Sequence, residues 1–139
     1  MFDDDVDVQI GHTRGKNIKF EWILSVKGIT IRSEKGKIYA YSTLELVAVL
    51  MWLYSKFGQS PFPLANNPEL LAQHTEQDGL GVALYTVKPQ LVFVQAASYL
   101  GLVLEQLDIF EHVKGSPIQW KIKHEPEGFS KVIAKITAY

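Results

Sequence analysis

One short segment of the chain brings together the residue types of acid–base chemistry. His74 is followed by Glu76 and Asp78, at the end of an expected short helix and just before a turn with Gly79 and Gly81. An imidazole beside two carboxylates can act as a general base or hold a metal ion. The alternative interpretation is a solvated helix end, where a histidine interacts favourably with the helix dipole. His74, Glu76 and Asp78 are therefore the candidate ligand-binding residues.

Other patterns that would indicate an enzyme or a metal centre are missing from the sequence. The chain has no cysteine, and its four histidines do not pair at the spacing of a zinc protease or a zinc finger. Four aspartates within the first seven residues lack the glycine and the twelve-residue frame of a calcium-binding loop. The glycine turn at 78–81 precedes a predicted strand, the reverse of a dinucleotide-binding motif. We therefore predict no catalytic residues, no metal and no cofactor, and favour a protein that is not an enzyme.

A basic stretch in the N-terminal third is the first candidate nucleic-acid surface. The residues selected by this interpretation are Arg14, Lys16, Lys19, Arg32, Lys35 and Lys37. Phe20 and Trp22 lie among them, and basic side chains interleaved with aromatic ones can follow a phosphate backbone and stack on bases. The alternative is a solvated strand face and hairpin tip, with Phe20 and Trp22 turned into the core.

A helix that leads into a two-stranded hairpin is predicted over residues 103–123. This unit resembles the end of a winged-helix DNA-binding domain, in which a helix precedes a β-wing. The resemblance implies nucleic-acid contacts from the basic hairpin residues, here Lys114, Lys121 and Lys123. A recognition helix must present polar or basic side chains to bases and phosphates, and the expected helix offers few. The alternative is an ordinary helix–hairpin within the core.

Two segments are apolar nearly all the way round a helix, Thr43–Phe57 and residues 89–107. A surface helix of a soluble domain has one apolar stripe and one polar face, so we expect both segments to be enclosed by the fold or by another subunit. In the second segment, a strand at Leu91–Val94 followed by a helix over 96–107 is a rival interpretation, because periodicity cannot classify a continuous apolar run. We expect the long helix there, and a homo-oligomer.

The remaining pattern predicts the other elements. Strict alternation favours a strand over 18–27, and 29–32 and 37–41 have the pattern of paired strands. Ser42 and Glu45 have the spacing of a capping box at the start of the first long helix. A short helix is expected over 68–77. Further strands are expected at 82–87, 109–113, 118–123 and 131–137, the second and third of these forming the hairpin.

The overall composition bounds the class of protein. The 139 residues have a net charge of −1, and the longest apolar run is nine residues, far short of the about 20 that a membrane span needs. The acidic start lacks the pattern of a secretory signal. We expect a cytoplasmic protein with no membrane contact. Residues 1–17 are expected to be an acidic tail or loosely packed segment, and residues 18–139 a single domain.

The expected fold class is α+β, with a mostly antiparallel sheet packed against two long apolar helices and one short helix. The expected function is a non-enzymatic binding or assembly module that self-associates through apolar helix surface, and a second protein is an alternative partner. The alternative function is a nucleic-acid-associated regulator with a winged-helix-like C-terminal helix–hairpin.

Overall fold

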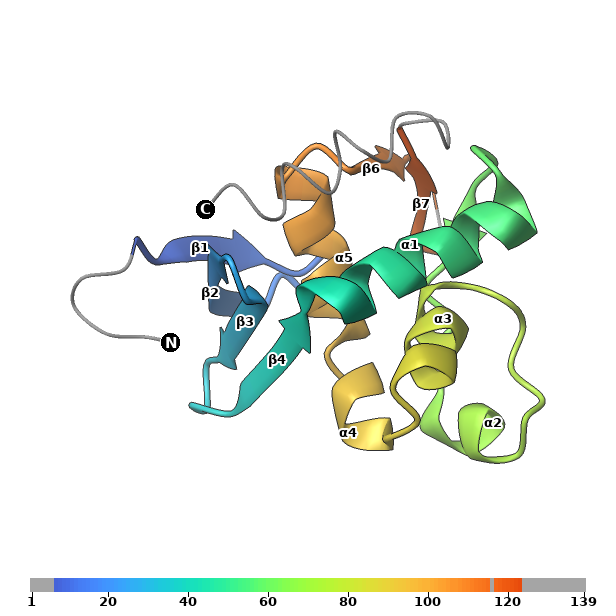
Figure 1. Cartoon of the computed structure of the whole chain (residues 1–139), viewed down its shortest axis with the longest axis horizontal. Helices are drawn as coiled ribbons and strands as arrows, with labels where there is room; N and C mark the ends of the chain where they lie inside the picture. The colour runs from blue at the N-terminus through green and yellow to red at the C-terminus, as the bar shows by residue number, and fades with distance from the viewer. Residues whose placement is uncertain (1–6, 116, 124–139) are drawn as a thin grey trace.

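Two antiparallel sheets and five helices make up the part of the chain that a computed structural model describes, residues 7–115 and 117–123 (Figure 1). The first sheet precedes the helices along the chain. The second sheet combines a short strand that follows the first helix with two strands that follow the last helix. The predicted α+β class is confirmed, with two small sheets in place of one. The strand expected at 131–137 lies outside the described residues.

The first sheet is a meander in which each strand pairs with the next one along the chain. Its strands are β1 (Gln9–His12), β2 (Lys19–Ser25), β3 (Gly28–Ser33) and β4 (Ile38–Ser42). Alternation places Phe20 and Trp22 on the buried face, and Trp22 pairs with Ile31 in the neighbouring strand. The three strands predicted between residues 18 and 41 are confirmed. β1 comes from the segment before residue 18, and pairs along the edge of β2.

Helix α1 (Thr43–Phe57) follows β4 directly and has the predicted bounds. The Ser42 hydroxyl accepts a hydrogen bond from the Glu45 N–H at 3.1 Å, and the Ser42 N–H donates to the Glu45 carboxylate at 2.8 Å. This capping box satisfies two backbone groups that the first turn would otherwise leave unpaired. Gly58 ends the helix in the left-handed region, at φ 58°.

The other helices depart from the sequence-based expectations. They are α2 (Pro68–Ala72), α3 (Leu80–Val87), α4 (Leu91–Val94) and α5 (Ala97–Gln106). The strand predicted at 82–87 is wrong, because these residues belong to α3. Leu80, Ala83 and Leu84 recur at helical spacing on its buried side, where it packs against α1. This tertiary packing overrides the strand preference of an apolar, partly β-branched run.

Two further helix predictions are corrected by the structure. The long helix over 89–107 is interrupted at residues 95–96, so it forms α4 and α5, and Leu91–Val94 is helical where the rival interpretation had a strand. The helix expected over 68–77 ends at Ala72. His74 takes a left-handed φ of 59°, and the N–H groups of His74 and Thr75 close the end by donating to the carbonyls of Leu71 and Leu70.

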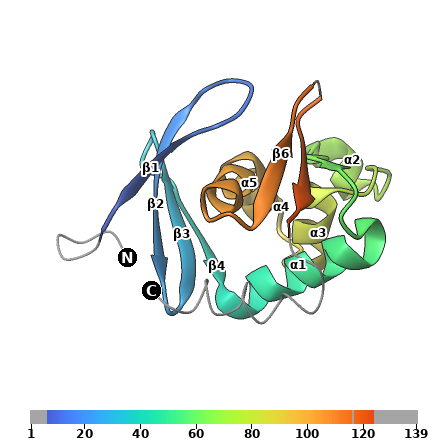
Figure 2. The same ribbon diagram turned by 90° about the horizontal axis from the view of Figure 1, so that it is seen from above.

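The second sheet has the order β5-β7-β6, from strands β5 (Phe62–Pro63), β6 (Phe110–Val113) and β7 (Gln119–Ile122). The predicted hairpin is confirmed as β6 and β7. Helix α5 lies between this hairpin and the meander (Figure 2). Within the described residues, no helix has the length and apolarity to cross a membrane.

Helix α5 is the centre of the core, because both sheets pack against it. Six of its ten residues are buried, and the Tyr99 ring lies 4.8 Å from that of Phe20 in the meander. On the hairpin side, a Cβ at Gly101 would lie only 2.5 Å from the Trp120 ring. The helix can approach Trp120 this closely because position 101 has no side chain.

Candidate functional site

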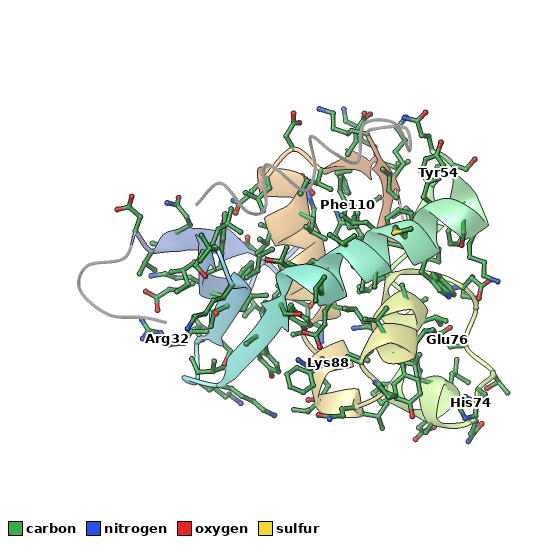
Figure 3. All side chains as sticks on the ribbon, viewed as in Figure 1. Arg32, Tyr54, His74, Glu76, Lys88 and Phe110 are labelled. Carbon is green, nitrogen blue, oxygen red and sulfur yellow. The ribbon has the colours of Figure 1, made fainter. Side chains whose placement is uncertain are left out.

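The acid–base candidates lie around the end of α2 but do not form one cluster. Figure 3 shows His74 and Glu76 in this part of the molecule, at the far side from Arg32 in the meander. The His74 ring is next to Tyr85, with 6.3 Å between ring centroids. No group of three or more histidine, aspartate or glutamate side chains could hold a metal ion in the described part of the chain.

The Glu76 carboxylate has a structural role. One oxygen accepts from the Asn67 N–H at 3.0 Å and the other from the Gln77 N–H at 2.9 Å, so it fixes the segment that enters α2. Glu76 also borders an open depression of about 520 Å³, whose other lining residues include Asn66 and Gln95. His74 and Asp78 do not line it. The structure therefore gives these three residues no shared site.

Four of the nine candidate nucleic-acid-binding residues are held in ion pairs within the molecule. In the meander, Arg32 bonds to the Glu21 carboxylate across the β2–β3 pair at 2.6 Å. The four pairs are Arg14 with Glu105, Arg32 with Glu21, Lys121 with Glu111, and Lys123 with Asp108. These cations are partly neutralised by neighbouring carboxylates, so they are less available to an external anion.

The other five basic candidates make no ion pair with the residues that the structure describes. They stand in the connections between strands or, for Lys19, at the first residue of a strand, and we call them the loop lysines: Lys16, Lys19, Lys35, Lys37 and Lys114. The Nζ of Lys37 lies 5.7 Å from the centroid of the Tyr39 ring. The loop lysines are thus the part of the predicted basic surface whose charge remains exposed.

The aromatic residues of the basic stretch do not belong to that surface. Phe20 is 1% exposed and Trp22 is 6% exposed, and both point into the core. The Trp22 indole N–H donates to the side chain of Gln106 on α5 at 2.9 Å. Neither ring can stack on a base, so the alternative interpretation, a strand with aromatic residues turned inward, describes this part of the meander.

Glu105 on α5 is a polar junction that the sequence analysis did not identify. One carboxylate oxygen accepts from the Trp120 indole N–H at 3.0 Å and from Arg14 Nε at 3.1 Å, and Arg14 also pairs with the other oxygen. Burial alone would raise the pKa of Glu105, but the hydrogen bonds from Arg14 and Trp120 and the nearby positive charge lower it below its ordinary value. A signal for this pairing is absent from local spacing, because 91 residues separate the partners.

Helices α1 and α5 differ in how far they are buried, although both are apolar in sequence. Helix α5 is mostly buried between the sheets, and Gln106 is its one exposed residue. Helix α1 is covered on one side only. On its other side Leu44 is 83% exposed and Met51 is 56% exposed, with Val47 and Ala48 between them half-buried. We call these four residues the outward face of α1.

Comparisons with known proteins assign no family to this arrangement. The chain matches no family model, no curated protein and no solved structure. Two surfaces of the described residues expose side chains suited to binding. The outward face of α1 is apolar, and the loop lysines are positively charged.

Proposed function

We propose that the protein is a non-enzymatic assembly module that forms a homodimer through the outward face of α1. The observation that carries this proposal is the exposure of Leu44 and Met51, two large apolar side chains on one side of a single helix. No charged residue stands between them on that side. A contiguous apolar patch of this kind typically marks a protein contact, because its burial removes apolar surface from water.

The spacing along the outward face favours a second copy of the chain as the partner. Leu44 and Met51 lie at equal distances along the helix from the midpoint between Val47 and Ala48. Two copies of α1 that cross antiparallel at this midpoint would place Leu44 of each against Met51 of the other, with the small Ala48 at the crossing. A two-fold interface requires this self-complementarity. The antiparallel arrangement also opposes the helix dipoles favourably.

The expected dimer is weak. Four side chains on one helix cannot supply the about 800 Å² per partner that a standard interface buries. We therefore expect monomer and dimer to exchange within an experimentally accessible concentration range. The equilibrium should show the signature of apolar burial, a negative heat-capacity change on association.

The test is sedimentation velocity over a hundredfold concentration range. The wild-type chain should shift from monomer to dimer, and Leu44→Glu should remain monomeric because two carboxylates would enter an apolar contact. We expect dimerisation to weaken at least tenfold, about 1.4 kcal/mol. The matched control is Leu70→Glu, which makes the same change at a 37% exposed leucine on α2 and should leave the equilibrium unchanged.

Two results would contradict the proposal. One is a wild-type chain that sediments as a monomer at every concentration. The other is equal weakening by Leu44→Glu and Leu70→Glu, which would indicate a general effect of charge and not a contact on α1. Far-ultraviolet circular dichroism of each variant establishes that it is folded before it is compared.

A further inference from the structure

We propose that the loop lysines form a surface that binds the phosphate backbone of double-stranded DNA without reading its sequence. This inference is independent of the proposed dimer, because the loop lysines and the outward face of α1 share no residue. The loop lysines are spread over almost one hundred positions of the chain, and they come from three strand connections and from the first residue of β2.

The topology of the meander brings four of the loop lysines to one end of the first sheet. Successive strands run in opposite directions, so the β1–β2 and β3–β4 connections emerge at the same end, and the β2–β3 turn emerges at the other. Lys16 lies in the first connection and Lys19 begins β2. Lys35 and Lys37 belong to the β3–β4 connection. Four positive charges therefore lie at the same end of the sheet.

The β6–β7 hairpin adds Lys114 to this surface. Figure 2 shows the β1–β2 loop and the strands of the β6–β7 hairpin extending to the same side of the molecule, with α5 between them. The two are in contact, because a Cβ at Gly15 would lie 3.0 Å from Cδ1 of Ile118. The bond network at Glu105 holds them in this arrangement, since Arg14 in the loop and Trp120 in the hairpin bond to the same carboxylate.

The charge on this surface is available to a polyanion. Its arginine neighbours, Arg14 and Arg32, pair with Glu105 and Glu21, so these two carboxylates are already neutralised. Glu34 is the one acidic residue within the β3–β4 connection. The three connections thus contain four of the loop lysines and one acidic residue. Lysine ammonium groups on long flexible stems suit phosphate contact and release counterions when they bind.

The surroundings of the loop lysines define how DNA would be bound. Helix α5 is mostly buried and exposes one polar side chain, that of Gln106, so it lacks the row of polar or basic side chains that the recognition helix of a winged-helix domain needs. Buried Phe20 and Trp22 cannot provide a stacking platform for a single strand. Phosphate contact alone remains. A duplex should then bind more tightly than a single strand, because its charge density is higher.

The experiment is fluorescence anisotropy of a short labelled duplex of arbitrary sequence, titrated with wild-type protein at several salt concentrations. We expect log K to fall linearly with log salt. The double variant Lys16→Glu and Lys35→Glu should bind at least tenfold more weakly, and each lost phosphate contact should reduce the salt slope by about 0.9. The sedimentation equilibrium of this variant should match that of the wild type, because its outward face of α1 is intact.

The matched control is the double variant Lys27→Glu and Lys56→Glu, which changes the net charge equally. Lys27 lies in the β2–β3 turn, at the opposite end of the meander, and Lys56 lies in the last turn of α1. This control should retain wild-type affinity and slope apart from a small long-range effect. The proposal is overturned if the duplex does not bind at low salt, if both double variants lose affinity equally, or if an oligo-dT single strand binds more tightly than the duplex.

Discussion

Glu105 connects three elements through one carboxylate. It stands on α5, and its partners Arg14 and Trp120 come from the β1–β2 loop and from β7. The side chain of Glu105 is 19% exposed and that of Arg14 is 39% exposed. Solvent therefore screens the ion pair between them more than it weakens the hydrogen bond from the buried Trp120 indole to Glu105. We infer that the hydrogen bonds that Glu105 accepts contribute more to stability than its electrostatic attraction to Arg14.

Glu105→Gln should lower the free energy of unfolding by about 1–2 kcal/mol at neutral pH, because the amide cannot serve both donors equally and the ion pair is lost. The pKa of Glu105 is lowered in the fold, so its contribution is complete above the ordinary value of 4.5 and is lost as the pH falls through the lowered pKa. The difference between wild type and variant should therefore shrink in acid. Urea unfolding at a series of pH values measures it.

Glu111→Gln is the control for this prediction. Glu111 pairs with Lys121 at 3.7 Å and its side chain is 52% exposed, so the change should cost only a few tenths of a kcal/mol. A Glu105→Gln deficit that is the same at every pH would show that the carboxylate charge contributes nothing.

At the scale of elements, the packing of α5 against β7 depends on Gly101. The Trp120 ring is fully buried, and three of its atoms would lie within 3 Å of a Cβ at position 101. Trp120 belongs to the core cluster, where close packing opposes displacement of the ring. A residue that would normally weaken a helix is therefore required here by the contact between helix and strand.

Gly101→Ala should destabilise the protein by about 1–2 kcal/mol. Overpacking a well-filled core costs about 1–3 kcal/mol, and the better helix propensity of alanine, worth up to about 1 kcal/mol, offsets only part of this. Chemical denaturation provides the measurement, and near-ultraviolet circular dichroism reports the Trp120 environment. Ser98→Ala in the same helix should be nearly neutral. A Gly101→Ala variant more stable than the wild type would contradict this account of the contact.

At the scale of the whole molecule, the two sheets share one core through α5. Phe20 of the meander contacts Tyr99 of α5, and the Trp22 indole bonds to Gln106 of the same helix. The other side of α5 packs on the hairpin through Gly101 and Trp120. Loss of the meander would expose one side of the helix on which the hairpin rests, so we expect the described part of the chain to unfold as one unit.

Phe20→Ala should test this cooperativity. Truncation of a fully buried phenylalanine costs about 3–5 kcal/mol, which should lower the thermal midpoint of the whole protein and not of the meander alone. Far-ultraviolet circular dichroism and tryptophan fluorescence should give coincident transitions in both wild type and variant. The protein concentration is kept fixed, because the proposed dimerisation would shift the midpoint. Two separate transitions, with the meander melting first, would show that the sheets are independent.

The sequence by itself determined the elements whose signals are local. Alternation predicted β2, and the turn at residues 33–36 predicted the pair β3 and β4. The Ser42–Glu45 spacing predicted the start of α1, and the turn residues around Gly115 predicted the final hairpin. Each of these signals depends on residues a few positions apart, whose backbone preferences and hydrogen bonds form within the segment itself. The α+β class followed from the order of these elements.

Only the tertiary structure decided which apolar surface is covered. Residues 82–87 became helical because α3 packs against α1, and α5 was enclosed between two sheets while the outward face of α1 was left exposed. Long-range packing likewise paired Arg14 with Glu105, whereas the loop lysines were left without such a partner among the described residues. A helix that is apolar all the way round has no polar stripe to indicate its outer side. Ion pairs between residues far apart in the chain give no signal in local spacing. For these two reasons, neither the outward face of α1 nor the division of the basic candidates into ion-paired residues and loop lysines could be predicted from the sequence.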